Sequence, residues 1–126
     1  MPMKMPKTAP EPLELFRKLV EGDARLAVKK VFGHPTAFVN GNMSFGVFGS
    51  DLFFRLSDAD QKLAVQIPGT RPFEPMPGRP MRGYLVLPSP VLKKVPEARR
   101  WVERSVRHAL SLPPKGTKAR PPGPRS

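Results

Sequence analysis

The fold is decided by residues 36–56, which read TAFVNGNMSFGVFGSDLFFRL. Two turn signals, Asn40-Gly41 and Gly49-Ser50, divide this stretch into three apolar segments. Asn-Gly favours a type I′ turn because both residues accept positive φ, and a Gly in the first position suits a type II′ turn. The stretch therefore predicts three antiparallel strands joined by two-residue hairpin loops.

These two loops also predict how the strands pair. Phe38 should face Met43, Thr36 should face Phe45, and Phe45 should face Phe54. Because opposed residues share a face, one face should carry the apolar residues Phe38, Met43, Phe45, Val47, Leu52, Phe54 and Leu56. The other face should carry Ala37, Ser44, Gly46, Phe53 and Arg55. A one-residue slip would scatter the apolar set, so we expect the first face to be the core.

Amphipathic helices flank this sheet in the sequence. The first begins at Pro12, ends at Gly22 and places five apolar residues in one arc: Leu13, Leu15, Phe16, Leu19 and Val20. The last runs from near Pro96 to Ser111, with Ala98, Trp101, Val102, Val106, Ala109 and Leu112 on one side and Arg99, Arg100, Arg104 and Arg107 opposite. With further strands near residues 26–32 and 84–87, the expected fold is α+β. An antiparallel meander of about four to five strands is packed on one side by the N- and C-terminal helices.

A short helix should follow the meander. Ser57 can cap it, and Asp58 and Asp60 favour its positive end. Leu63, Ala64 and Ile67 form its narrow apolar side, and we count Leu63 and Trp101 among the expected core residues. The two aspartates could also be an acid pair for catalysis or metal binding, but no third ligand is nearby, so we favour the capping role.

Residues 68–83 form a proline-rich segment with five prolines between residues 68 and 80. Proline excludes a helix and a central strand here, while Phe73, Met76 and Met81 indicate an ordered, packed loop. The segment contains three arginines, Arg71, Arg79 and Arg82, and a single acid, Glu74. The arginines could bind an anion or a partner, or they could bond loop carbonyls and Glu74 as an architectural feature.

Length and composition limit the classes of protein. A chain of 126 residues holds one domain, expected at residues 12–112 between two disordered tails, residues 1–11 and the basic, proline-rich residues 113–126. The absence of cysteine excludes disulfides, thiolate catalysis and zinc fingers. No apolar run is long enough to span a membrane, and the N-terminus lacks a secretory apolar stretch. We therefore expect a cytoplasmic protein that does not contact membranes.

Candidate chemistry is sparse. The two histidines, His34 and His108, have no metal-ligand spacing with acidic residues. Ser44, Ser50 and Ser57 lack a nucleophile-elbow context, and no phosphate-binding glycine loop is present. We expect no enzymatic activity, no metal and no cofactor.

Three segments carry a family resemblance: Val31-Phe32-Gly33, residues 37–43 (AFVNGNM) and residues 73–84 (FEPMPGRPMRGY). In these segments and in Trp101-Val102 of the last helix, the chain resembles the TfoX/Sxy N-terminal domain family. The resemblance covers roughly residues 13–112. The resemblance implies an α+β domain with helices on an antiparallel sheet, often paired as a dimer, and it places no catalytic residues. Full-length members regulate natural competence and add a C-terminal helical domain. After Leu112 this chain has only a short basic tail, so we expect a stand-alone domain.

Two functions remain open. The first is a non-enzymatic regulatory or protein-interaction domain whose partner is another protein or a second copy. The second is a nucleic-acid-binding accessory protein that uses the basic face of the last helix and the tails, because 22 basic and 10 acidic residues give a net charge of +12. The candidate binding residues are Arg71, Arg79, Arg82, Arg100 and Arg104.

Overall fold

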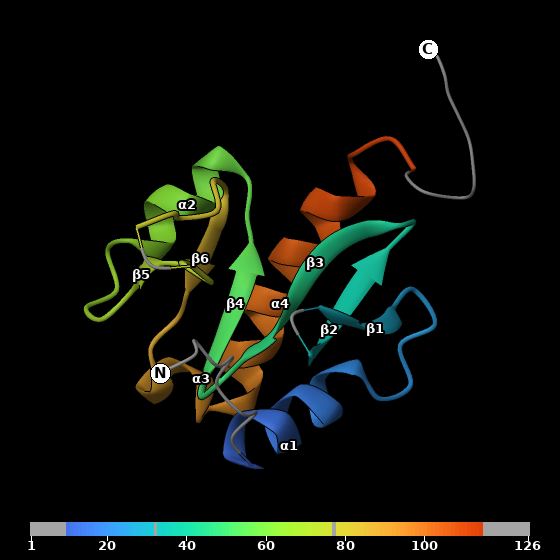
Figure 1. The fold of residues 1–126 in the computed structure, drawn as a ribbon, viewed down its shortest axis with the longest axis horizontal. Helices are drawn as coiled ribbons and strands as arrows, with labels where there is room; N and C mark the ends of the chain where they lie inside the picture. Colours follow the sequence, from blue (N-terminus) through green and yellow to red (C-terminus); the bar gives the residue numbers. More distant parts are fainter. Residues whose placement is uncertain (1–9, 32, 77, 115–126) are drawn as a thin grey trace, which may run out of the picture.

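The computed structural model describes residues 10–31, 33–76 and 78–114. Within these ranges six strands form one antiparallel sheet of order β1-β2-β3-β4-β6-β5 (Figure 1). The strands are β1 (Ala27–Val31), β2 (His34–Val39), β3 (Asn42–Phe48), β4 (Asp51–Arg55), β5 (Arg71–Pro72) and β6 (Tyr84–Val86). The helices are α1 (Pro10–Val20), α2 (Asp58–Ala64), α3 (Ser89–Leu92) and α4 (Val95–Leu110). The expected α+β class is confirmed.

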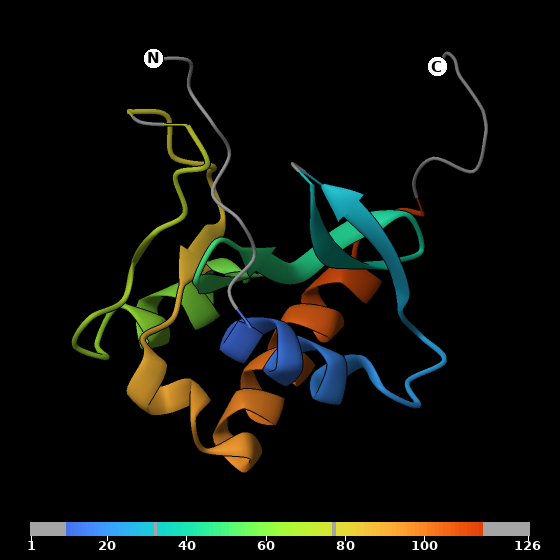
Figure 2. The same ribbon diagram turned by 60° about the horizontal axis from the view of Figure 1, so that its bottom comes forward.

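The two long helices, α1 and α4, cover one face of the sheet (Figure 2). Between them and the strands lies the main core, which includes Phe16, Phe45, Val47, Leu52, Phe54, Trp101, Val102 and Val106. Ring contacts continue through it, since Phe45 packs on Phe16 at 5.6 Å and on Phe54 at 5.7 Å between centroids. The placement of both amphipathic helices on one side is confirmed.

Both hairpin loops form where the turn residues predict them. Asn40 and Gly41 have φ values of 50° and 81°, as a type I′ turn requires. Gly49 has a φ of 64°, and Phe48 pairs with Asp51 across the second loop. The pairs Phe38–Met43 and Phe45–Phe54 are also as predicted, and Val47 pairs with Leu52.

The expected pairing of Thr36 with Phe45 is wrong, because Ser44 forms a β-bulge. Thr36 pairs with Gly46 and Ala37 with Phe45, so one extra residue enters β3 between the pairs at Met43 and Phe45. Such a bulge leaves one residue unpaired and changes the face of everything beyond it. Ala37 and Val39 consequently lie in the main core, whereas Phe38 and Met43 move to the opposite face and are only half-buried.

Four other expectations need correction. The first helix begins at Pro10, two residues before the expected boundary. Leu63 is 44% exposed instead of buried, since only Ala64 of α2 enters the core. The proline-rich segment includes the short edge strand β5, which pairs with β6. The short helix α3 follows Pro88, where only the end of a strand was expected.

The cap of α2 is confirmed, because the Ser57 hydroxyl accepts a hydrogen bond from the Asp60 amide at 3.2 Å. No helix within the described ranges is long and apolar enough to cross a membrane. Residues 1–9 and 115–126, which make up most of the two expected tails, lie outside the described residues.

Candidate interaction surface

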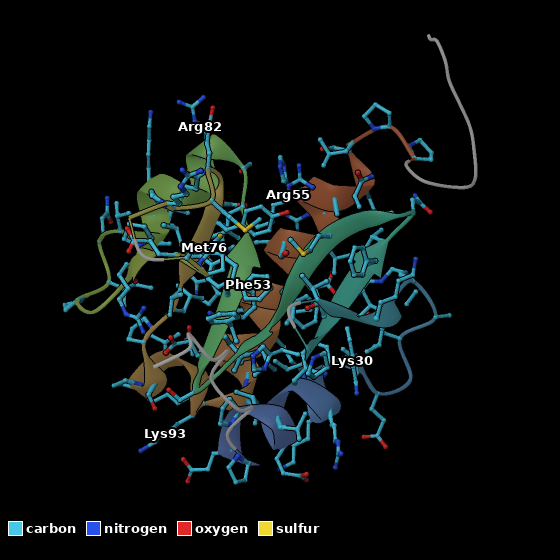
Figure 3. All side chains as sticks on the ribbon, in the orientation of Figure 1. Lys30, Phe53, Arg55, Met76, Arg82 and Lys93 are labelled. Carbon is cyan, nitrogen blue, oxygen red and sulfur yellow. The ribbon has the colours of Figure 1, made fainter. Side chains whose placement is uncertain are left out.

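The face of the sheet turned away from α1 and α4 carries a second apolar cluster. Phe53, Phe73, Tyr84 and Val86 are its buried members. Phe53 projects from β4, and Phe73 from the proline-rich loop stacks on it with ring centroids 4.1 Å apart and planes 8° apart. Figure 3 views this face and labels Phe53 at its centre. We call it the helix-free face.

Backbone hydrogen bonds hold the loop against this face. The Phe73 amide donates to the Tyr84 carbonyl at 3.2 Å, and the Met81 amide donates to the Phe73 carbonyl at 2.8 Å. A proline-rich segment loses little conformational freedom on folding, so few such bonds suffice to order it. The loop thereby becomes one side of the helix-free face, as Figure 2 shows.

The border of the cluster is apolar but incompletely covered. Met43, Phe48 and Met81 pack against it and are half-buried, and Met76 in the loop is 59% exposed. These include every methionine of the described residues. Methionine is flexible and polarizable, which suits surfaces that adapt to a partner.

Cations lie on the aromatic rings of this face. The guanidinium of Arg55 lies 5.5 Å from the Tyr84 ring centroid, and the Lys29 ammonium lies 5.4 Å from that of Phe38. Arg55 also donates a long hydrogen bond of 3.4 Å to the Met43 carbonyl. Burial raises the pKa of the Tyr84 phenol, an effect that the nearby Arg55 charge opposes. The face therefore combines apolar contact area with positive charge.

The three loop arginines do not come together in one site. Arg71 forms an ion pair with Asp51 at 2.8 Å, and not with Glu74 as the architectural interpretation expected. Arg79 and Arg82 are exposed, and within the described residues neither makes a side-chain hydrogen bond or ion pair. Figure 3 shows Arg82 pointing away from the sheet. Both side chains are therefore available to a partner.

Arg100 and Arg104 lie in α4, on the opposite side of the sheet from the proline-rich loop. A shallow groove of about 310 Å³ follows α4 and is lined by Pro96, Arg99, Arg100, Glu103, Arg104 and Arg107. Arg104 forms an ion pair with Asp60 at 2.7 Å and lies 5.1 Å from the Trp101 ring centroid. Arg100 lies 3.9 Å from Glu97.

Neighbouring groups also engage this groove. Glu103 bonds Arg25, which lowers the pKa of the Glu103 carboxyl. The Arg99 guanidinium donates to the Lys18 carbonyl at 3.3 Å. Of the four arginines on this side of the helix, Arg100 and Arg104 thus have acid partners among the described residues.

A larger cleft of about 530 Å³ lies between α1, α3 and the β3–β4 turn. Its floor is aliphatic, and its rim contains the acids Glu11, Glu14 and Asp51 and the bases Lys18, Arg71 and Lys93. The equal number of opposite charges gives no preference for an anion or a cation. No histidine lines the cleft.

The candidate catalytic groups lie apart. His34 is 2% exposed and packs on Phe48 with ring centroids 5.0 Å apart, whereas His108 lies in α4. Asp60 of the possible acid pair is bound to Arg104. Within residues 10–31, 33–76 and 78–114, no cluster of three or more histidine, aspartate or glutamate residues could hold a metal ion.

The residues of the helix-free face were missed as a site by sequence reasoning. The bulge at Ser44 was not anticipated, so Met43 and Phe38 were assigned to the core. One signal was present: Phe48 and Phe53 fall on the face opposite the expected core. Two large aromatic side chains on that face require a cover, and Phe73 in the proline-rich loop supplies it.

Comparison with known proteins gives one match. The family model of the TfoX N-terminal domain matches residues 15–109. No curated protein and no solved structure matches the chain.

Proposed function

The chain belongs to the TfoX N-terminal domain family, and we propose that it is a non-enzymatic regulatory domain that binds a partner protein through its helix-free face. The observation that carries this proposal is the uncovered side of the second apolar cluster. Met43, Phe48 and Met81 at its border are half-buried, Met76 of the loop is exposed, and the Arg55 cation lies over the Tyr84 ring within the cluster. A contiguous apolar area with a charged rim is typical of a protein-binding surface.

The positive charge around the helix-free face indicates the chemistry of the partner. Arg55, Arg79 and Arg82 border or adjoin the face, and Glu74 is the single acid of residues 68–83. An acidic protein segment that also carries apolar side chains fits this combination, because complementary charge accelerates and orients association. A second copy of the chain fits less well, since each copy carries a net charge of +12.

Nucleic acid is the competing partner. The basic face of α4 is the strongest support for nucleic acid in the sequence. On that face, however, Arg104 is bonded to Asp60 and Arg99 to the Lys18 carbonyl, and Arg100 lies 3.9 Å from Glu97. The aromatic rings at the centre of the helix-free face are stacked on one another and buried. Those rings are not free to stack on bases.

The test is capture of partners from native lysate by the whole chain and by two pairs of variants. Met76→Glu and Arg82→Glu alter the helix-free face and its loop. Leu63→Glu and Arg100→Glu introduce the same charges on α2 and α4, where Leu63 is 44% exposed and the Arg100 side chain 74% exposed.

We expect one protein to be captured by the natural chain and by both controls, and to be lost with Met76→Glu and Arg82→Glu. Thermal melts should show all four variants folded, because exposed positions contribute little to stability. Equal capture by all variants would exclude the helix-free face. Loss of capture after nuclease treatment would identify nucleic acid as the bridge.

A further inference from the structure

We infer that β1 is a docking edge to which an acidic, extended segment of another protein adds as a seventh strand. This site adjoins the helix-free face, with which it shares Lys29, but it does not depend on the function proposed above. The two edges of the sheet are β1 and β5. β5 has two residues, one of which is Pro72, so it offers little backbone for pairing. β1 has five residues and contains no proline.

The pairing of β1 with β2 shows which backbone groups face outward. Lys30 is opposite Pro35, which has no amide hydrogen, so this pair is of the non-hydrogen-bonded kind. The two kinds of pair alternate along an antiparallel ladder. Val28, opposite Ala37, is therefore also non-hydrogen-bonded to β2.

The amide and carbonyl groups of Val28 and Lys30 consequently point away from the sheet. Both residues are exposed, and no backbone hydrogen bond within the described ranges joins them to another segment. Their spacing of two residues is the spacing at which an added strand exchanges hydrogen bonds. The edge thus presents two donors and two acceptors in the geometry that strand addition uses.

The side chains of β1 specify the chemistry of the added strand. Lys29 and Lys30 are neighbours, so they lie on opposite faces of the sheet, and Val28 is 50% exposed. A strand running antiparallel to β1 would place two adjacent carboxylates opposite the lysines and an apolar residue opposite Val28. Opposite charges at cross-strand positions stabilise pairing, and like charges destabilise it.

A second copy of β1 meets this requirement poorly. Pairing two β1 strands about their central residue opposes Lys29 to Lys29, and each chain brings a net charge of +12. Lysines on an edge strand discourage self-association of this kind. An acidic segment removes that repulsion, which is why the inference commits to a different protein.

The probe for this site is the blocked pentapeptide acetyl-Thr-Glu-Glu-Val-Thr-amide, titrated into the whole chain at low salt. Hydrogen exchange should report an alternating pattern. The amides of Val28 and Lys30 should become slower to exchange as peptide is added, while the amide of Lys29, already bonded to β2, should change little. No slowing at about 1 mM peptide, a concentration that detects even weak complexes, would overturn the inference.

Two variants of equal charge test the lysines. Lys30→Glu should weaken peptide binding at least about tenfold, whereas Lys93→Glu, at the residue that follows α3, should leave it within about twofold. Figure 3 shows that Lys30 and Lys93 lie in different parts of the molecule, and both are exposed. Equal weakening by the two variants would show attraction to net charge alone and would overturn the site.

Backbone pairing is tested separately. A peptide N-methylated at its first Glu and at its Val keeps the charges but loses the two donors that face β1, and it should not bind. Val28→Pro removes an outward amide without breaking a β1–β2 bond, and it should also abolish binding in a chain that still melts cooperatively. Binding of the methylated peptide, or a β1-dependent dimer in light scattering, would contradict strand addition by an acidic partner.

Discussion

At the scale of residues, two buried serines hold the bulge of β3 against α4. The Ser105 hydroxyl donates to the Ser44 carbonyl at 2.8 Å, and the two hydroxyl oxygens are 2.7 Å apart. Because Ser105 has a single hydroxyl hydrogen and uses it on the carbonyl, the Ser44 hydroxyl must donate to Ser105. Both side chains are fully buried, so each depends on the other for hydrogen bonding.

Replacement of Ser105 by alanine should therefore destabilise the domain. Ser105→Ala leaves the Ser44 hydroxyl and the bulge carbonyl without partners, at a cost of about 1–3 kcal/mol in the free energy of unfolding. The matched control is Ser111→Ala, which removes an exposed hydroxyl from the end of the same helix and should cost less than about 0.5 kcal/mol. Urea unfolding measures both. Equal small losses would mean that the bulge does not need this bond.

The core allows a second comparison between residues. Phe45 is fully buried between Phe16 and Phe54, so Phe45→Ala should lower the free energy of unfolding by about 3–5 kcal/mol. Leu63→Ala, at a position 44% exposed, should change it by less than about 0.5 kcal/mol. Chemical denaturation of the two variants checks this difference, and a large effect at Leu63 would contradict the surface position of that side chain.

At the scale of elements, α4 links the pH of the solution to stability. Burial lowers the pKa of His108 and the charge of Arg55 lowers it further, while Asp58 and Asp60 act in the opposite direction. The folded state thus binds a proton at His108 less readily than the unfolded state, whose histidine pKa is near 6.5. The stability contributed by the neutral ring is present above pH 6.5 and is lost as the pH falls through the folded-state pKa.

His108→Gln should remove this part of the pH dependence. We expect the natural chain to lose more unfolding free energy than the variant between pH 7.5 and pH 5.5, because glutamine cannot be protonated in this range. Urea unfolding at both pH values gives the two differences. An identical pH dependence would show that other groups, and not His108, control acid stability.

At the scale of the whole molecule, the residues that form the core and half of the net positive charge lie in different segments of the chain. The members of both apolar clusters fall between Phe16 and Ala109, whereas residues 1–9 and 115–126 contain six basic residues and no acid. A chain of residues 10–114 would therefore carry a net charge of 12 minus 6, or +6. Because the core is unchanged, its melting temperature should remain within a few degrees of that of the full chain.

The same truncation should weaken binding to a nonspecific polyanion such as heparin, since fewer cations release counterions. A lower salt concentration for elution from heparin measures this change. A large fall in melting temperature would show that residues outside 10–114 pack on the domain, and unchanged elution would place the polyanion contacts on the domain itself.

Local patterns in the sequence determined much of this protein. Asn40-Gly41 and Gly49-Ser50 defined two hairpins because their residues favour the backbone angles of those turns. The spacing of apolar residues in α1 and α4 defined which side of each helix enters the core. Ser57 marked the start of α2 because its hydroxyl can cap amide groups. Each of these signals acts over a few neighbouring residues.

The tertiary structure decided what depends on residues far apart in the chain. The bulge at Ser44 is stabilised by Ser105, 61 positions away, so no local pattern revealed it, and the faces of Phe38 and Met43 changed with it. Arg104 forms an ion pair with Asp60 of α2, and Arg71 forms one with Asp51 beside the β3–β4 turn. Because each arginine is held by its own acid, the two do not form a shared binding site. The docking edge at β1 likewise follows from Pro35 lying opposite Lys30, a pairing that exists only once the strands meet.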